Sequence, residues 1–310
     1  MKRILITGAS GLLGVNLALT AARDGSRYEV YGTINQHALQ TEAFAVIQTD
    51  LLAPGALERL LEQSRPDWVI HCAALADLEA CEAEPEKARQ LNSVLPEKLA
   101  RHVARGGARL VHISTDAVFD GQRGDYAEAD APNPRSTYAR TKLEGELAVA
   151  AANPQAIIAR VNLFGWSLSG RRSLAEFFFN NLRAGKPVPG FTDIFFCPLL
   201  ANDLAALFFQ MLEKDLHGLY HVVSRDCTSK YDFGVQIARR FGLDESLITP
   251  TSVERAGLKA ARSPRLTLRT DKLSQALGAP LPALSTSLDR FYTLYQQGYP
   301  QVIRKMAGHF

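Results

Sequence analysis

Three glycines near the start of the chain constrain its fold more than any other feature of the sequence. Gly8, Gly11 and Gly14 stand in the stretch TGASGLLG, after the apolar segment RILIT (3–7) and at the start of a helix-length segment that ends at about Arg23. In a strand–turn–helix unit, the first glycine permits the tight turn, the second lets the backbone approach a pyrophosphate, and the third lets the helix pack on the sheet. The spacing predicts a dinucleotide-binding crossover. A glycine turn that only caps this crossover is the structural alternative.

The rest of the first half alternates short apolar segments with helix-length amphipathic ones. Further strands are expected at 28–33, 44–48, 68–72, 109–114 and 156–161, and helices at 54–64, 85–105 and 134–152. Strands that are apolar on both faces and separated by helices predict a parallel sheet covered on both sides, with right-handed crossovers. We therefore expect an α/β fold with a doubly wound parallel sheet of the Rossmann type.

After about Gly165 the alternation becomes irregular. Helices are expected at 173–184, 202–214, 231–241 and 284–297, and strands in GKPVPG (185–190) and LYHVV (219–223). This part predicts a smaller C-terminal α/β lobe that binds the substrate. The dinucleotide-binding domain is expected to take 1–165 and about 191–218, and the substrate-binding lobe 166–190 and 219–310.

Charge and hydropathy argue against nucleic-acid and membrane partners. The net charge of +3 is small for 310 residues, and no run of Lys and Arg resembles a polybasic patch. The most apolar later stretch (194–212) is interrupted by Pro198, so no membrane-spanning helix is expected.

The cysteines indicate the compartment. Cys72, Cys81, Cys197 and Cys227 show no CxxC or other metal-ligand spacing. In a chain of this size they are expected to be reduced thiols of a cytoplasmic protein, without a bound metal.

The end of the second strand indicates which dinucleotide binds. An Asp or Glu there would bind the ribose 2′-hydroxyl of NAD and repel a 2′-phosphate. The chain instead reads TINQH (33–37), with no carboxylate before Glu42. We predict NADP(H), with NAD(H) as the alternative because no arginine stands there to bind the phosphate. Asp50 is expected at the adenine edge, unless it only caps the helix that follows.

Two polar groups should meet at the carboxyl end of the sheet, where ligands of such folds lie. Ser114 and Thr115 end one strand, and Tyr138 and Lys142 lie four residues apart in STYARTK (136–142), on one face of a helix. Hydride transfer to a carbonyl leaves an oxygen that needs a proton. Tyr138 can supply it if Lys142 favours the phenolate, and Thr115 can donate a hydrogen bond to that oxygen. Alone, the Tyr/Lys spacing is an ordinary helix face.

Taken together, the glycine loop, the strand-end Ser-Thr and the Tyr/Lys pair resemble the extended short-chain dehydrogenase/reductase superfamily. Within it, STDAVFDG (114–121), YARTKLEGE (138–146), GFTDIFFCPLLANDLA (190–205) and KAARSPRLTLRTDKLSQALG (259–278) look like the dTDP-4-dehydrorhamnose reductase group. The resemblance implies an NADP(H)-dependent oxidoreductase that reduces a keto group of a nucleotide-activated sugar, as in dTDP-L-rhamnose synthesis. Ala117 follows Asp116 where related dehydratases carry a glutamate, which favours reduction over dehydration.

The resemblance also completes the expected site. It implies that Lys142 holds the nicotinamide ribose and that Asn92 matches a helix asparagine of the superfamily, although a polar residue packed at a helix kink is the alternative for Asn92. The cofactor is expected to contact Gly8, Ser10, Gly11, Leu12, Leu13, Gly14, Thr33, Asn35, His37, Asp50, Leu51, Cys72, Ala73, Ala74, Asn92, Ser114, Tyr138 and Lys142. The substrate is expected to contact Asp116, Val118, Phe119, Asn162 and Arg262. For Asp116, bonding to nearby backbone amides is the alternative, and for Cys72 to Ala74 it is close helix–sheet packing.

One departure leaves other functions open. The reductase group carries Arg-Thr-Ser-Trp after the sixth strand, whereas this chain reads Arg160, Val161, Asn162 and Leu163, with Trp166 out of register. The chain also resembles the NADP-binding regulatory subunit of methionine adenosyltransferase, and a nucleotide-sugar epimerase is a third alternative. Dimers are common in the superfamily, so a homodimer is the expected assembly.

Overall fold

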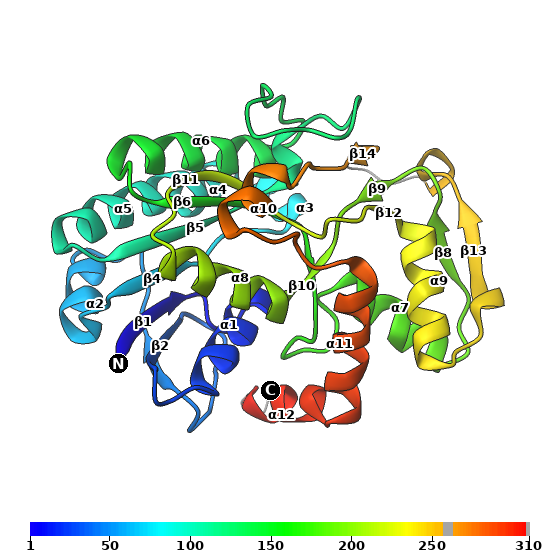
Figure 1. The fold of residues 1–310 in the computed structure, drawn as a ribbon, viewed down its shortest axis with the longest axis horizontal. Coiled ribbons are helices and arrows are strands. Elements are labelled where there is room, and N and C mark those ends of the chain that lie inside the picture. The colour runs from blue at the N-terminus through cyan, green and yellow to red at the C-terminus, as the bar shows by residue number, and fades with distance from the viewer. Residues whose placement is uncertain (257–262, 308–310) are drawn as a thin grey trace.

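A parallel sheet forms the centre of the molecule. In the computed structural model, which describes residues 1–256 and 263–307, seven strands pair in the order β11-β6-β5-β4-β1-β2-β3 and every pairing is parallel. The strands are β1 (Lys2–Thr7), β2 (Tyr28–Ile34), β3 (Ala45–Gln48), β4 (Trp68–His71), β5 (Arg109–Thr115), β6 (Ile157–Val161) and β11 (Gly218–Val222). The order reverses between β1 and β4, as in a doubly wound sheet (Figure 1). The predicted fold class is confirmed.

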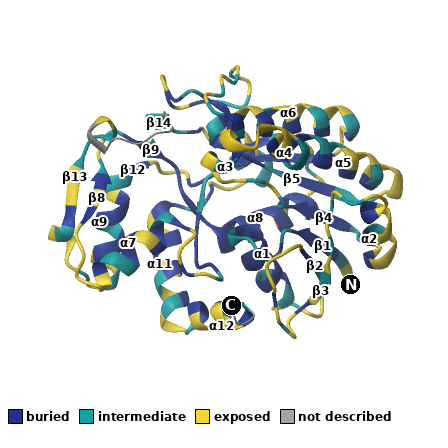
Figure 2. Ribbon diagram, turned by 180° about the vertical axis from the view of Figure 1, so that it is seen from behind, coloured by how far each residue is buried: buried dark blue, intermediate teal, exposed yellow. Residues whose placement is uncertain are grey.

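Helices cover both faces of this sheet. One face carries α1 (Leu12–Ala22) and α8 (Ala201–Glu213); the other carries α2 (Ala56–Ser64), α5 (Leu95–Gly106) and α6 (Thr137–Ala152). Ile4 and Ile6 of β1 pack with the first group of helices, and Leu5 packs with the second. Side chains alternate along a strand, so both faces of β1 are apolar and buried. Figure 2 shows the central strands as buried, whereas β3 at the edge of the sheet is partly exposed.

A smaller lobe lies beside the sheet (Figure 1). Its elements are α7 (Leu174–Arg183), β8 (Val188–Phe191), α9 (Lys230–Phe241), β13 (Ile248–Thr251) and α11 (Leu284–Gln296). β8 and β13 pair in parallel, with α7 and α9 packed beside them. Trp166 is 1% exposed and stacks on Phe291 of α11, with 4.1 Å between ring centroids. Trp166 therefore belongs to the aromatic core of the lobe.

Very short strands connect the lobe to the sheet. β9 (Phe195–Phe196) lies between β12 (Thr228–Ser229) and β14 (Arg265–Leu266), and β7 (Leu163–Phe164) pairs with β10 (Leu199–Leu200). Single turns of 3-10 helix lie at Asp116–Val118, Glu245–Leu247 and Val253–Ala256. Strands of two residues leave too short a pattern to be recognised in a sequence.

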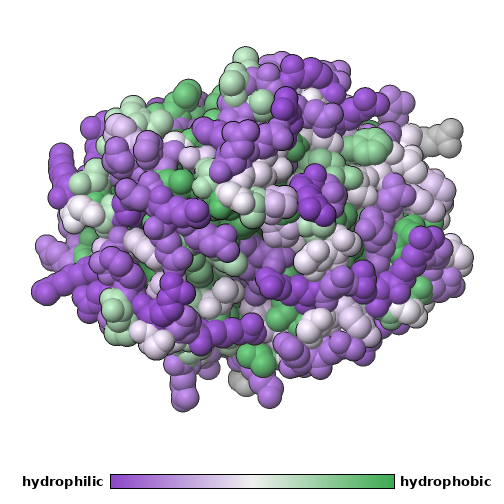
Figure 3. Space-filling model, in the orientation of Figure 1, coloured by the Kyte–Doolittle hydropathy of each residue, from purple (hydrophilic) through white to green (hydrophobic). Residues whose placement is uncertain are grey.

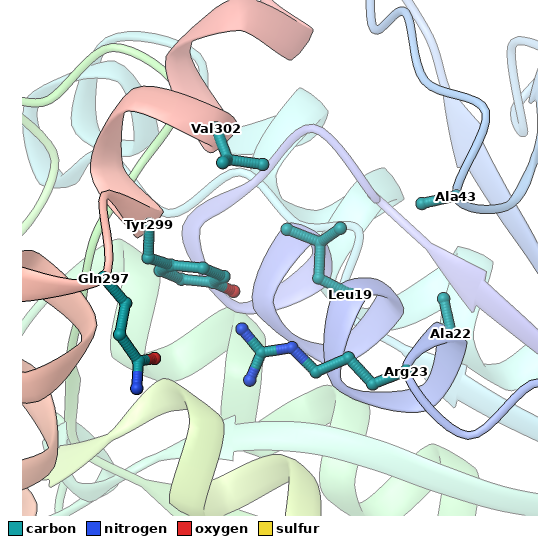
Figure 4. Close-up of a pocket in the computed structure, with 7 residues that line it drawn as sticks. All are labelled: Leu19, Ala22, Arg23, Ala43, Gln297, Tyr299 and Val302. Carbon is teal, nitrogen blue, oxygen red and sulfur yellow. The ribbon is translucent and has the colours of Figure 1, made fainter.

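Two segments return from the predicted substrate lobe to the dinucleotide-binding domain. β11 pairs with β6, so the division expected after residue 218 falls inside the sheet. α12 (Tyr299–Met306) packs against α1, where the Tyr299 hydroxyl donates to Asn16 Oδ1 at 2.9 Å. Figure 4 shows the surface hollow between them, with Tyr299 facing Arg23. The rest of the domain division stays a prediction.

Helices differ from the expected ones in four places, one of which is α12, where no helix was expected. The single helix expected at 85–105 consists of α4 (Pro85–Arg89), a π-helical turn (Gln90–Val94) and α5. α3 (Leu78–Ala83) and α10 (Asp271–Leu277) were not expected, and α10 packs on β11, where Lys272 Nζ donates to the Leu219 carbonyl at 2.7 Å.

One disulfide contradicts the expectation that all cysteines are reduced. Cys197 and Cys227 are bonded, whereas Cys72 and Cys81 are free thiols. Cys197 follows β9 and Cys227 precedes β12, so the antiparallel pairing of these strands brings their Cα atoms to 4.1 Å. The spacing of the cysteines along the chain does not reveal this pairing. The cytoplasmic location stays a prediction. Of the four cysteines that suggested it, only Cys72 and Cys81 are reduced.

The surface in Figure 3 is dominated by hydrophilic residues, with hydrophobic ones scattered among them. Among the residues that the structure describes, the large hydrophobic side chains that are exposed are far apart in the sequence: Met1, Leu52, Leu147, Phe177 and Val302. Within residues 1–256 and 263–307, every helix is too short or too polar to cross a membrane.

Candidate active site

The glycine loop has the geometry that a pyrophosphate requires. Gly8 has φ +69°, a left-handed conformation that favours glycine, and a Cβ there would lie 2.9 Å from the Ala73 amide nitrogen. A Cβ on Gly14 would lie 2.2 Å from the Gly8 carbonyl oxygen. At Gly11 a Cβ would meet only the Gly8 carbonyl, at 3.1 Å. Gly11 is the N-cap of α1 and has no side chain that could bond the amides of the first turn. That turn also carries no acidic residue. The amides of this turn fit a phosphate anion.

Residues expected at the ribose and adenine divide into structural and exposed groups. Thr33 is 2% exposed. Its Oγ1 accepts a hydrogen bond from the Gly8 amide at 3.3 Å, and its carbonyl accepts one from the Ala9 amide at 2.8 Å. Thr33 therefore stabilises the glycine loop. Asn35 and His37 are exposed just beyond β2. Asp50 Oδ1 accepts from the Leu52 amide at 3.0 Å in the turn after β3, whereas the N-cap of α2 is Gly55, so the helix-capping alternative for Asp50 is wrong.

The segment after β4 is hydrogen-bonded to Thr7, the residue before the glycine loop. Thr7 Oγ1 accepts from the amides of Cys72 and Ala73, at 3.2 Å each. With two amides donating to it, this hydroxyl gives its own hydrogen to His71 Nδ1, 2.7 Å away. Small side chains at Cys72 and Ala73 are thus explained by close packing. Burial also raises the pKa of the Cys72 thiol.

Tyr138 lies in the first turn of α6, and two residues fix that turn. Ser136 caps the helix by accepting from the Ala139 amide at 3.2 Å. Glu82 accepts from both the amide and the hydroxyl of Thr137, at 2.7 Å each. Desolvation raises the pKa of Tyr138 to about 12, while the Thr115 hydroxyl lowers it and Asp116 raises it further. Tyr138 is therefore a neutral phenol.

Lys142 does not lower the pKa of Tyr138 as expected. Its Nζ donates to the Ile113 carbonyl at 2.6 Å, so the ammonium is directed at the backbone of β5. Burial lowers the pKa of Lys142 to about 8, opposed by Glu146 and Cys72. Buried His71 and His112 flank it, and desolvation lowers the pKa of both rings, that of His71 to about 3. The lysine thus faces neutral rings, which the sequence did not reveal.

Thr115, Asp116 and Asn162 form a hydrogen-bonded chain next to Tyr138. Thr115 Oγ1 donates to Asp116 Oδ1 at 3.0 Å and accepts from the Ala117 amide at 3.1 Å. Asn162 Nδ2 donates to Asp116 Oδ2 at 2.6 Å. Burial raises the pKa of Asp116 to about 6, although the bonds from Asn162 and Thr115 lower it. Because the Thr115 hydrogen is directed at Asp116, its donation to a substrate oxygen stays a prediction.

A pocket of about 290 Å³ lies between the two lobes and brings this chain together with residues far away in sequence. Its lining residues are Ala76, Leu78, Asp116, Ala117, Arg135, Ser136, Tyr138, Asn162, Ile194, Phe195, Phe196, Lys230, Ser263 and Leu266. Two of them are cations: Arg135 from the loop before α6, and Lys230 from the start of α9. The sequence analysis named Asp116, Tyr138 and Asn162 among these residues and missed both cations.

Several expected contacts lie elsewhere. Val118 and Phe119 are completely buried, and Phe119 stacks on Tyr126 at 4.2 Å, so they support the pocket from beneath instead of lining it. They follow a strand end, but the 3-10 turn at Asp116–Val118 directs them into the core. Arg262 lies outside the described residues.

Ser114 and Asn92 belong to the scaffold beneath the site. Ser114 Oγ donates to Glu146 Oε1 at 2.5 Å, and Glu146 forms a buried ion pair with Arg160 at 2.8 Å. Asn92 lies in the π-helical turn, where its Oδ1 accepts from the Leu75 amide at 2.9 Å and its Nδ2 donates to the Leu75 carbonyl at 3.0 Å. Asn92 is thus a polar residue packed at a helix kink, which was the alternative to its contact with the cofactor.

The sequence of residues 1–297 matches the family described as the RmlD substrate binding domain. "Probable low-salt glycan biosynthesis reductase Agl14" of Haloferax volcanii is 33% identical over 288 residues, which cover 91% of this chain and 95% of the relative. The dTDP-4-dehydrorhamnose reductase of Mycobacterium tuberculosis is 32% identical over 309 residues, with 93% and 96% covered. Methionine adenosyltransferase 2 subunit beta of Xenopus tropicalis is 32% identical over 265 residues, with 83% and 77% covered.

Solved structures give the same picture of the fold. The dTDP-4-dehydrorhamnose reductase of Clostridium acetobutylicum superposes with a TM-score of 0.80 at 28% identity, over 94% of this chain and 99% of that one. The enzyme of the same name from Bacillus anthracis, solved in complex with NADP, superposes with a TM-score of 0.80 at 24% identity, over 94% and 99%.

Proposed function

The chain belongs to the RmlD substrate binding domain family, and on that basis we propose that it is an NADP(H)-dependent reductase of a nucleotide-activated keto sugar. The substrate it fits best is dTDP-4-dehydrorhamnose, on which relatives that match nearly the whole chain are named to act. The matches span both the glycine-loop domain and the lobe that closes the pocket, so they cover the whole reaction site.

The observation that carries the proposal is the neutral phenol of Tyr138 in the pocket wall. A reduced nicotinamide supplies a hydride when bound, and the carbonyl oxygen that accepts it then needs a proton. A tyrosine with a pKa of about 12 is protonated at neutral pH and can give that proton. The reverse reaction would need the phenolate, which burial disfavours. The phenol is thus in the protonated form that the reduction step uses.

The remaining residues take roles that follow from their positions. The glycine loop and the first turn of α1 hold the pyrophosphate, and exposed Asn35 and His37 lie where a 2′-phosphate would be bound. Asp116 and Asn162 present polar atoms to the sugar. Arg135 and Lys230 supply positive charge for the substrate diphosphate.

The test is NADPH oxidation in the presence of a 4-keto-6-deoxy nucleotide sugar. The dTDP-linked and UDP-linked forms are compared at equal concentration, with the 4-hydroxy sugar as the control. We expect oxidation that depends on the keto sugar and is faster with dTDP. A purified protein that binds NADPH but oxidises it with neither keto sugar would contradict the proposal.

The likeness to methionine adenosyltransferase 2 subunit beta favours one second candidate, an NADP-binding regulatory subunit. Its signature would be a stable complex with a methionine adenosyltransferase catalytic subunit, together with no turnover of a keto sugar. A homodimer in the cytoplasm is the assembly and location we expect, and gel filtration of the full chain tests the assembly.

A further inference from the structure

One side of the substrate pocket is built almost entirely by the smaller lobe. We call it the lobe wall and define it by its pocket-lining residues Ile194, Phe195, Phe196, Lys230, Ser263 and Leu266. These residues come from β9, from the start of α9 directly after β12, and from β14 and the residues before it. The lobe wall therefore depends on three segments that are distant in sequence and must stay paired.

Few backbone contacts hold these segments together. β9 pairs with β12 at two positions, Thr228 with Phe196 and Ser229 with Phe195. It pairs with β14 at the same two residues, through Arg265 and Leu266. Ladders of this length are marginal in water unless something else fixes them.

The disulfide lies where it can fix all three segments. Cys197 directly follows β9, and Cys227 directly precedes β12, so the bond closes the end of the β9–β12 ladder. Cys197 Sγ also accepts a hydrogen bond from the Leu268 amide at 3.4 Å, two residues after β14. One sulfur atom thus connects β9 to both of its neighbours.

The two cysteines of the disulfide differ in exposure. Cys197 is completely buried in a small apolar cluster with Val118 and Phe119, whereas Cys227 is exposed. An attacking thiolate in solution therefore has a route to Cys227, and Cys197 is the sulfur that leaves.

We propose that Cys197 and Cys227 are a reversible thiol–disulfide site whose oxidation state sets the order of the lobe wall. The reductant is a dithiol. One of its thiolates attacks Cys227 Sγ, the bond between the cysteines breaks, and Cys197 leaves as a thiolate that takes up a proton. The second thiolate of the dithiol then displaces Cys227, which is protonated in turn. Two electrons reduce the cystine to two thiols, and the dithiol becomes a disulfide.

The consequence for substrate binding rests on the proposed function. Asp116, Tyr138 and Asn162 stand on the dinucleotide-binding domain, so reduction leaves the proton donor in place. Phe195, Phe196 and Lys230 lose their cross-link and become less ordered. Reduction should therefore raise KM for the nucleotide sugar and change kcat little.

The primary test uses the full chain and does not require any activity. Wild-type protein is compared before and after treatment with dithiothreitol, by counting thiols and by hydrogen exchange. We expect two thiols in the oxidised form and four in the reduced form, from the four cysteines of the chain. Exchange of the amides at 194–197 and 227–230 should rise at least about ten-fold on reduction, whereas exchange in β5 stays the same.

Two variants control the result. In Cys227→Ser the exposed cysteine is removed, and exchange should match that of the reduced wild type. In the double variant Cys197→Ser with Cys227→Ser, Cys72 and Cys81 remain, so dithiothreitol should have no further effect on exchange or KM. Four thiols in protein treated with oxidised glutathione, or equal exchange of the lobe wall in both forms, would overturn the proposal. An enzyme without keto-sugar turnover would overturn only the proposed function, because the exchange result is independent of it.

Discussion

The two walls of the substrate pocket are built in different ways. Asp116 and Asn162 directly follow β5 and β6 of the seven-stranded sheet, and Tyr138 lies on the helix that covers it. We call these three residues the catalytic wall; it lies above a buried ion pair between Glu146 and Arg160. The lobe wall rests on strands of two residues joined by a disulfide. The proposed chemistry thus stands on a continuous sheet, and the proposed recognition stands on ladders of two residues.

This difference indicates which amino-acid substitutions each wall tolerates. The proton donor must be held in one geometry relative to the reacting oxygen, and a continuous sheet with a packed helix provides that. Residues that recognise a sugar and a diphosphate can differ between related enzymes without disturbing the sheet. The lobe wall is therefore where we expect the substrate preference of this chain to be set.

The largest effect is expected beneath the catalytic wall. Arg160→Leu leaves Glu146 as a buried charge without its partner, which typically costs about 3–5 kcal/mol. Urea denaturation measures the loss. The matched control is Arg239→Leu, which breaks an exposed ion pair with Glu245 and should leave the free energy of unfolding unchanged. If the two variants had equal free energies of unfolding, the buried ion pair would stabilise the fold no more than the exposed one, which would contradict the prediction.

The next effect concerns the lobe wall. Cys227→Ser opens the loop of 30 residues that the disulfide closes, and such a loss typically costs about 2–4 kcal/mol. Urea denaturation without reductant measures it, with reduced wild-type protein as the control that should behave alike. If the variant keeps the stability of the oxidised wild type, the disulfide does not stabilise the fold.

The buried carboxyl of Asp116 predicts a pH dependence. Burial raises its pKa from the usual 3.8 of an aspartate to about 6, so the folded state holds this proton more tightly. The stability that this gives is complete below about pH 4 and is lost as the pH rises through about 6, by about 3 kcal/mol. The unfolding free energy of wild type minus that of Asp116→Asn should fall across this window. A difference that does not change between pH 4 and 7 would contradict the assignment.

The smallest effect concerns recognition. Lys230→Gln removes a cation from the lobe wall and should raise KM for the nucleotide sugar about ten-fold, the value of a hydrogen bond to a charged group, with kcat nearly unchanged. Lys214→Gln, at an exposed position outside the pocket lining, is the control for a lost charge. A fall in kcat with constant KM would mean that Lys230 acts in the reaction step, and it would contradict the assignment of the lobe wall to substrate binding.

The sequence predicted the strands and the helix that carry the catalytic wall, because their signals are local. The glycine loop, the strand end at Thr115 and the helix with Tyr138 each lie within one strand–turn–helix unit, and parallel strands bring their carboxyl ends to one edge. Side-chain direction was less predictable. Ser114 and Asn92 were expected at the cofactor but are bonded to Glu146 and to the Leu75 backbone.

The lobe wall could not be predicted for a physical reason. Its strands are two residues long, so they carry no periodic pattern, and their pairing joins segments near 195, 228 and 265. The disulfide and the position of Lys230 both depend on that pairing. The electrostatics of Lys142 were missed because its ammonium is directed by one carbonyl, that of Ile113, which helical spacing does not reveal.

The most direct test of the account is the turnover of Tyr138→Phe with a dTDP-linked 4-keto-6-deoxy sugar and NADPH. The variant keeps the ring and loses only the hydroxyl that gives the proton. We predict a kcat lower by about 10²–10⁴-fold, with NADPH affinity unchanged, whereas the control Tyr292→Phe keeps the full rate. A Tyr138→Phe enzyme that turns over at the wild-type rate would contradict the central claim that this phenol is the proton donor.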